Sequence, residues 1–193
     1  FLAIELLNQV LEWEPQNYDA RVYLARIQQT YASPEKGRQI LESGKPFHEN
    51  NPYYRLEMGK LDQAIGNAES ALDHFTYAAE NEIDLSKPVS KKESNSLKSE
   101  ALRSIGEIHL QNNDPQKAES YFDQAIEAMP HNSQAILDSA KLAFESGDAM
   151  HCRTRLHQMA ELPDDIRPPR DVIANALPSK EWRNLLTKEI PGK

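Results

Sequence analysis

The chain has 193 residues, of which 39% are hydrophobic and 27% charged, a balance that supports a packed core and argues against a disordered chain. The formal net charge of -8 opposes general affinity for nucleic acid or for an anionic membrane. The sequence contains no run of 18 apolar residues, so direct membrane insertion is not predicted. The single cysteine, Cys152, excludes an internal disulfide and is compatible with a reducing compartment such as the cytoplasm, with a bacterial periplasm left open.

Segments along the chain repeat one pattern of small and large residues. With the first residue of each segment numbered as position 1, the pattern places residues of similar size at positions 8, 20, 24 and 27. The residues at these positions are, in chain order, Ala25, Gly37, Leu41 and Gly44 in the segment from Tyr18; Gly59, Ala71, Phe75 and Ala78 from Pro52; Gly106, Ala118, Phe122 and Ala125 from Ser99; and Ala140, Cys152, Leu156 and Met159 from Ser133. Residues 1–17 supply only the second half of the pattern, with Ala3, Leu7 and Val10 at positions 20, 24 and 27.

Turn signals fall in the same frame. Positions 15 and 16 offer a helix stop followed by a residue that can accept hydrogen bonds from the next helix, namely Ala32-Ser33, Gly66-Asn67, Asn113-Asp114 and Gly147-Asp148. Pro34 and Pro115 follow directly, where a first-turn proline costs no hydrogen bond. Each segment is therefore expected to be a helix, a tight turn and a second helix.

This pattern closely resembles the tetratricopeptide repeat, a helix-turn-helix of 34 residues. The resemblance implies an all-α, right-handed solenoid of antiparallel helix pairs. The predicted organisation is the second helix of a truncated repeat at 1–17, repeats at 18–51, 52–85, 99–132 and 133–166, an insertion at 86–98, and a C-terminal cap region at 167–193.

Both ends of the predicted array, and its insertion, depart from the repeat. The serine- and lysine-rich insertion is expected at the surface, with its latter half lengthening the next helix. After Pro163 the prolines limit helix formation to a short segment at Arg170–Leu177 and a final capping helix. This helix is expected to present Trp182, Leu185, Leu186 and Ile190 on one face. The first residues lack a starting Met, and we expect the chain to be a fragment or processed product. Its Phe1, Ile4, Leu7 and Leu11 are expected to contact either an upstream helix or a second copy of the protein.

Residues with reactive side chains do not assemble into a catalytic or metal motif in the sequence. His151, Cys152 and His157 are close in sequence, but residues six apart lie on opposite sides of a helix, and Cys152 occupies a small-residue core position. His109 takes a position that is usually aromatic in the repeat, so it is interpreted as structural. No nucleophile elbow, phosphate loop or zinc spacing is found, so we predict no enzymatic activity and no cofactor.

The resemblance implies that the first helices of the pairs line a concave groove for a peptide. The expected groove residues are Arg26, Tyr53, Leu56, Lys60, Arg103, Glu107, Lys141 and Phe144. Recurrent cations at position 9 favour a partner with acidic groups and a few apolar anchors. The alternative interpretation is that Glu57, Glu100, Glu107 and Glu145 neutralise these cations through neighbouring pairs.

The sequence therefore predicts a non-catalytic scaffold or adaptor that binds a peptide segment of a partner protein and no nucleic acid. The Lys and Asn pattern with which some tetratricopeptide repeats clamp chaperone tails is absent, since Val22, Arg26 and Glu57 occupy the corresponding positions. Two alternatives remain. The chain is either a regulatory or substrate-recruiting segment of a larger enzyme, or a self-assembly module that forms homo-oligomers through its N-terminal helix.

Overall fold

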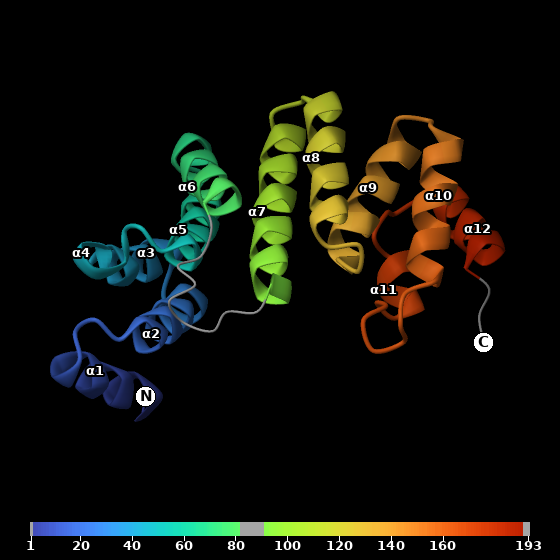
Figure 1. The fold of residues 1–193 in the computed structure, drawn as a ribbon. Coiled ribbons are helices and arrows are strands. Elements are labelled where there is room, and N and C mark those ends of the chain that lie inside the picture. Colours follow the sequence, from blue (N-terminus) through green and yellow to red (C-terminus); the bar gives the residue numbers. More distant parts are fainter. Residues whose placement is uncertain (1, 82–90, 191–193) are drawn as a thin grey trace. The chain divides into compact units, whose positions relative to one another are not determined.

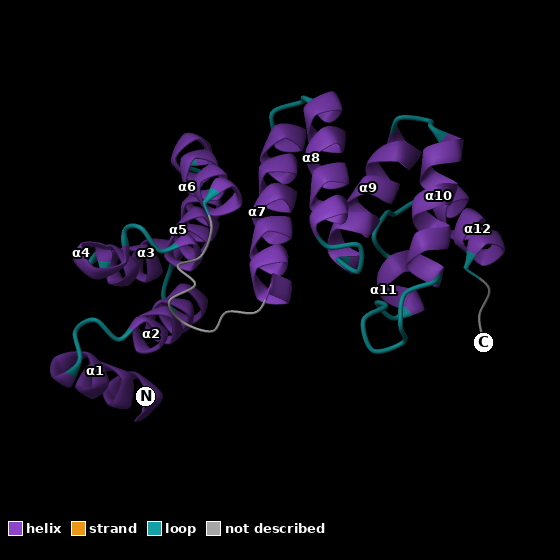
Figure 2. Ribbon diagram, viewed as in Figure 1, coloured by secondary structure: helices purple, strands orange, loops and turns teal. Residues whose placement is uncertain are grey.

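The computed structural model describes residues 2–81 and 91–190, and every regular element in these ranges is a helix (Figures 1 and 2). The helices are α1 (Leu2–Trp13), α2 (Tyr18–Tyr31), α3 (Pro34–Glu42), α4 (Lys45–His48), α5 (Pro52–Ile65), α6 (Ala68–Glu80), α7 (Lys91–Gln111), α8 (Pro115–Ala128), α9 (Ser133–Glu145), α10 (Ala149–Ala160), α11 (Arg170–Ala174) and α12 (Lys180–Glu189). Within the described ranges, none of them has the length and apolar character that crossing a membrane requires.

The helices divide into two compact units, Phe1–Ala101 and Leu102–Lys193, with the boundary inside α7. In the first unit α1 packs on α2, α2 on α3, α3 on α5 and α5 on α6. In the second unit α8 packs on α9, α9 on α10, and α12 on both α10 and α11. Packing between helices that are neighbours in the sequence confirms the predicted all-α solenoid of helix pairs.

Glycines at position 8 allow two helix pairs to pack closely. A Cβ atom on Gly59 would lie 2.6 Å from the Phe75 ring, and one on Gly106 would lie 2.7 Å from the Phe122 ring. Both rings are fully buried. Any larger residue at either glycine would displace a phenylalanine from the core. The glycine at position 8 and the phenylalanine at position 24 therefore pack as a matched pair.

The turns between paired helices follow the predicted chemistry at most positions. Gly66, Asn113 and Gly147 have φ angles of 90°, 58° and 78°, in the left-handed region that ends a helix. Asp114 and Asp148 each accept a hydrogen bond from the backbone of the helix that follows, as does Ser33. Two turn residues depart from the prediction. Ala32 has a φ of -125°, outside the left-handed region, and the Asn67 side chain accepts no capping hydrogen bond from α6.

The second helix of the Tyr18 segment is shorter than the repeat pattern predicts. α3 ends at Glu42, and Gly44, expected inside that helix, instead precedes the short α4. Arg21 lies at this break: it is 7% exposed and donates to the Ile40 carbonyl, the Pro15 carbonyl and Ser43 Oγ. A Cβ on Gly44 would lie 2.4 Å from Arg21 Cδ, so this glycine makes room for a buried cation.

The insertion predicted at 86–98 is helical in its latter half. α7 begins at Lys91, which makes it the longest helix in the described residues, with 21 residues. Leu97 and Ser99 are buried, at 3% and 0% exposure, so the added turns pack against the core. Residues 86–90 lie outside the described residues.

The C-terminal region closes the second unit. α11 stops at Ala174, three residues earlier than expected, and α12 buries Trp182, Leu186 and Ile190. Trp182 Nε1 donates to the Ile173 carbonyl at 2.9 Å, which ties α12 to α11. The expectation of a C-terminal capping helix is confirmed.

Candidate functional site

The predicted groove residues fall into two sets, one in each unit. Arg26, Tyr53, Leu56 and Lys60 lie on α2 and α5 of the first unit. Arg103, Glu107, Lys141 and Phe144 lie on α7 and α9 of the second. Each set is therefore considered separately.

Glu57 is the centre of the first set. Its carboxylate accepts from Arg26 Nε and Nη2, each at 3.0 Å, and from Lys60 Nζ at 2.9 Å. Lys60 Nζ also lies 2.8 Å from Glu100 Oε1. We call these four residues the Glu57 network. It links α2, α5 and α7 through alternating charges, with two cations and two carboxylates.

Burial and pairing act in opposite directions on the titration of Glu57. Burial alone would raise the pKa of this carboxyl, but hydrogen bonds from Arg26 and Lys60 and the charge of both cations hold the pKa below its usual value. The pKa of Lys60 is raised, since attraction to Glu57 and Glu100 outweighs the effect of burial. Both shifts favour the ionised forms of Glu57 and Lys60 at neutral pH.

A cavity of about 370 Å³ opens beside the network. Its wall combines apolar side chains with polar groups. The lining residues are Ala25, Arg26, Gln29, Thr30, Leu41, Glu57, Lys60 and Leu61. The volume of this cavity is at the small end of the range for ligand sites in proteins. It can therefore hold one large side chain, but not a cofactor.

Two residues of the first set have different environments from those expected. Leu56 is 3% exposed and belongs to the core, so it offers no surface to a peptide. Tyr53 is half-buried, and burial raises the pKa of its hydroxyl. Gln29 and Thr30 also line the cavity and were not predicted from the sequence, although they follow Arg26 by three and four residues and therefore share its helix face.

The second set is also paired internally. Arg103 Nη1 contacts Glu107 on its own helix and Asp138 Oδ2 on α9 at 3.0 Å. Lys141 Nζ lies 3.4 Å from Asp138 Oδ1. Phe144 packs edge-on against Trp182, with ring centroids 5.3 Å apart, so it supports the cap.

All four predicted cations therefore have a carboxylate partner. This arrangement agrees with the alternative interpretation, in which neighbouring carboxylates neutralise the cations. The predicted neutralising residues Glu57, Glu100 and Glu107 all take this role. For Lys141 the partner is Asp138 rather than the expected Glu145. Asp138 lies three residues before Lys141, a spacing that the sequence could have indicated.

A buried carboxylate on α5 serves a structural purpose. Asp62 is fully buried, and its oxygens accept from Arg38 Nε at 2.5 Å and Ser70 Oγ at 2.7 Å, with His74 Nε2 3.6 Å away. Burial and the charge of Arg55 lower the pKa of His74. These contacts join α3, α5 and α6, because a buried charge must be paired to be tolerated.

A serine, a histidine and a glutamate in the second unit have the connectivity of a hydrolase triad. His151 Nε2 lies 3.3 Å from Ser139 Oγ, and His151 Nδ1 lies 2.8 Å from Glu119 Oε1. However, Ser139 is 1% exposed, and Arg155 Nε donates to both Ser139 Oγ and His151 Nε2. A substrate cannot reach the serine, and the histidine's lone pair is already occupied, so the cluster holds α9 and α10 together.

The remaining reactive side chains are separated. Cys152 is 1% exposed in the core, while His157 lies on the surface and pairs with Glu189 Oε2 at 2.7 Å. His109 stacks on Tyr121 with ring centroids 5.3 Å apart. No group of three or more potential metal ligands comes together in residues 2–81 and 91–190.

Comparisons with known proteins agree with the helix pairs of the fold. One family model described as tetratricopeptide repeat matches residues 2–57 and 109–167, and a second with the same description matches residues 53–133. No curated protein sequence gives a significant match.

Several solved structures have a similar fold at low sequence identity. The structure of Pseudomonas aeruginosa PilF has a TM-score of 0.69 at 18% identity, with 97% of this chain and 82% of that chain covered. PilW, a type IV pilus biogenesis factor, gives 0.67 at 16% identity, with coverage of 97% and 84%. YrrB, a tetratricopeptide repeat protein with an unusual peptide-binding site, gives 0.57 at 11% identity, with coverage of 96% and 99%. At these identities the similarity establishes the fold alone.

Proposed function

Because the chain belongs to the tetratricopeptide repeat family, we propose that it is a non-catalytic adaptor that binds a peptide segment of a partner protein beside the Glu57 network. Members of this family are protein–protein interaction scaffolds, and the chain is such a scaffold. The proposal concerns the place and the chemistry of binding.

The cavity beside the network carries the proposal. It places an apolar floor of Ala25, Leu41 and Leu61 next to polar groups of Gln29 and Thr30. A bound peptide could insert one apolar side chain there while its backbone meets the polar rim. This combination of an apolar anchor and a few convergent polar groups is typical of peptide recognition.

The network adds preorganised hydrogen-bond donors. Arg26 uses Nε and Nη2 for Glu57, yet a guanidinium has five N–H donors, and the Arg26 side chain is 55% exposed. A peptide carbonyl or carboxylate could accept from the remaining donors. Because Glu57 already fixes the guanidinium, binding costs less side-chain entropy than it would with an unpaired arginine.

Because the charges of the network are balanced, we expect an apolar anchor residue, rather than acidic residues, to determine most of the affinity for a peptide. Arg26 and Lys60 are balanced by Glu57 and Glu100, so the surface offers little net positive charge. An acidic partner would have to compete with these carboxylates. The two kinds of partner differ in salt dependence, because screening weakens charge attraction but not apolar insertion.

Selection from a displayed library of random peptides tests the proposal. The wild type should enrich peptides with a shared large apolar residue, and Thr30→Trp, which fills the cavity, should weaken their binding at least tenfold. The matched control is Thr76→Trp, the same change at an exposed position of α6, which should bind like the wild type. If both variants bind the peptides equally well, the binding site does not lie beside α2 and α5.

The same peptides decide the role of charge. Enrichment of Asp and Glu, with affinity that falls steeply as salt rises, would show that the partner is acidic despite the ion pairs. Affinity that changes little between low and high salt would support the apolar anchor. Arg26→Gln, which keeps amide donors and removes the charge, should then reduce affinity only a few-fold.

A further inference from the structure

A second cavity, of about 390 Å³, lies in the second unit beside the capping helix, and we call it the cap cavity. Its lining residues come from two parts of the chain. They are Phe144, Gly147, Ala149 and Cys152 from α9, the following turn and α10, and Glu181, Asn184, Leu185 and Lys188 from α12. None of them lines the cavity beside the Glu57 network, so the two cavities are separate.

Small residues at the turn between α9 and α10 leave space for the cap cavity. Gly147 has a φ of 78°, and a Cβ atom added to it would meet no atom within 4 Å. Ala149, the first residue of α10, contributes only a methyl group. The Trp182 ring of the cap is nevertheless fully buried. The space therefore follows from the two small residues of the turn, while the cap itself is well packed.

One side of α12 packs into the core, and an adjacent side lines the cap cavity. Trp182 and Leu186 are buried, whereas Glu181, Leu185 and Lys188 line the cavity at spacings of four and three residues, which puts them on one helix face. This face is about 10.5 Å long, because the seven residues from its first to its last member each rise 1.5 Å. An extended peptide covers that length with about three residues.

The middle of the cavity wall is apolar. Phe144 meets the Trp182 ring edge-on, with centroids 5.3 Å apart, which fixes the orientation of the Phe144 ring. Phe144 and Leu185 are both half-buried, so each leaves apolar surface in contact with water. A large apolar side chain of a partner would cover this surface, and its burial would favour binding.

The two charged residues of the α12 face differ in their partners. Glu181 accepts a hydrogen bond from Ser179 Oγ at 3.0 Å, and hydrogen bonds from its own backbone N–H and from Ser179 lower the pKa of the Glu181 carboxyl. Among the described residues Lys188 forms no ion pair, and the adjacent Glu189 is engaged by two side chains of α10. Lys188 is therefore available to an anionic group of a partner.

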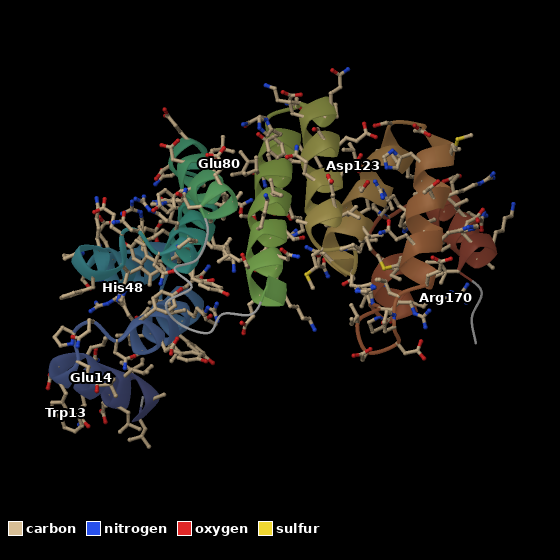
Figure 3. The ribbon with its side chains drawn as sticks, in the orientation of Figure 1. Trp13, Glu14, His48, Glu80, Asp123 and Arg170 are labelled. Carbon is tan, nitrogen blue, oxygen red and sulfur yellow. The ribbon has the colours of Figure 1, made fainter. Side chains whose placement is uncertain are left out.

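The surface around Lys188 is positive. The exposed ionisable residues of α12 are three cations and one carboxylate, namely Lys180, Arg183, Lys188 and Glu181. Side chains with nitrogen tips project from this end of the second unit (Figure 3). The four predicted groove cations, by contrast, all contact carboxylates. An acidic partner, as the sequence analysis predicts, therefore has better charge complementarity to α12 than to the groove.

We propose that the cap cavity binds a segment of about three residues from a partner protein, extended along α12. A large apolar side chain of the segment lies between Phe144 and Leu185, and an Asp or Glu side chain pairs with Lys188 Nζ. The Asn184 amide can both donate to and accept from the backbone of the segment. This site is independent of the one proposed beside the Glu57 network.

A library of short synthetic peptides with acetylated and amidated ends tests the proposal. The blocked ends leave side chains as the only source of carboxylate. The protein carries Thr30→Trp, which fills the first cavity, so a failure of the first site does not affect the result. Bound peptides should share a large apolar residue with Asp or Glu beside it, and their affinity should fall as salt rises. Peptides without an acidic residue would overturn the proposal.

Substitutions of lysines on α12 test the charge. Lys188→Gln should weaken the best peptide at least about tenfold, and Lys188→Arg, which keeps the charge, should bind within about twofold of the parent protein. The matched control is Lys180→Gln, the same change at an exposed position outside the cavity lining, which should bind like the parent. Equal losses in Lys188→Gln and Lys180→Gln would indicate general attraction to a positive surface and overturn the site.

Filling the cavity tests the apolar anchor. Ala149→Phe should weaken the same peptide at least about tenfold, because the new ring occupies the space of the anchor. Thr154→Phe, at an exposed position of α10 outside the cavity lining, should bind like the parent protein. Circular dichroism at rising temperature verifies that each variant is folded. Unchanged binding in Ala149→Phe, or binding only by peptides with a free terminal carboxylate, would contradict the proposal.

Discussion

The two tryptophans of the chain lie near its two ends and have opposite environments. Trp13, the last residue of α1, is 80% exposed, whereas Trp182, in the first turn of α12, is fully buried. α1 is nevertheless the more apolar of the two helices, with the sequence LAIELLNQVLEW against KEWRNLLTKE. Apolar composition alone therefore does not decide burial in a repeat protein; a complementary neighbour does.

The neighbour of α12 is specific in shape and in polarity. Phe144 meets the Trp182 ring edge-on, and the Ile173 carbonyl accepts its indole proton. At the rim, Glu189 pairs with Arg153 at 3.2 Å and with His157 at 2.7 Å. In the part of the chain that the structure describes, α1 has no comparable set of aromatic and charged contacts. The difference predicts that equivalent changes at the two helices have very unequal effects.

The largest contrast is expected between the two tryptophans themselves. Trp182→Ala should lower the free energy of unfolding by about 3–5 kcal/mol, since it removes a buried aromatic side chain from the cap. Trp13→Ala should change it by no more than about 0.5 kcal/mol. Urea unfolding followed by circular dichroism measures both, and a comparable loss in Trp13→Ala would show that Trp13 is covered in solution.

Leucines at position 24 give the next contrast. Leu156, on α10, is fully buried, and Leu156→Ala should cost about 2–5 kcal/mol. Leu7 occupies the same position on α1 and is only half-buried, so Leu7→Ala should cost about 1 kcal/mol or less. The same unfolding measurement tests the pair. Equal losses would mean that the repeat containing α1 is already complete.

The helix pairs were predictable because their determinants are local and periodic. A small residue at position 8, a large one at position 24 and a helix stop at position 15 lie within one segment, and each acts through a short-range contact. The contact between Gly106 and Phe122 is an example, because the spacing of these two residues in the repeat is enough to predict that they meet. The capping helix was predictable for the same reason, from the spacing of Trp182, Leu186 and Ile190.

The candidate site was less predictable because its determinants are contacts between helices. The cations at position 9 could be found from the repeat. Whether Arg26 is free to bind a partner, however, depends on its hydrogen bond to Glu57, which lies on a different helix. The close approach of Gly44 to Arg21, a buried cation that donates to a backbone carbonyl, is likewise a contact between separate segments. A periodic pattern contains no information on such individual departures.

Cys152 provides a chemical probe of the cap. It is 1% exposed, and burial raises the pKa of its thiol to about 11, so little thiolate exists at pH 8. The thiol lies beside α12, on the wall of a cavity shared with Leu185 and Lys188. We expect Trp182→Ala to accelerate alkylation by iodoacetamide at least tenfold and Trp13→Ala to leave the rate unchanged, as measured by mass spectrometry over time. An unchanged rate in Trp182→Ala would show that α12 does not protect this part of the core.

The smallest contrast concerns charged residues on the same two helices. Glu189→Gln removes the carboxylate that joins α12 to Arg153 and His157, whose side chains are 59% and 64% exposed. Pairs with such exposed partners contribute little, so the free energy of unfolding should fall by about 0.2–1 kcal/mol at low salt and by less at 1 M salt, where the Debye length is about 3 Å. Glu12→Gln, at an exposed position of α1, is the matched control and should have no measurable effect. A loss in Glu189→Gln that salt does not reduce would mean that this carboxylate positions α12 through packing rather than through charge, and the cap would then depend on its rim as well as on Trp182.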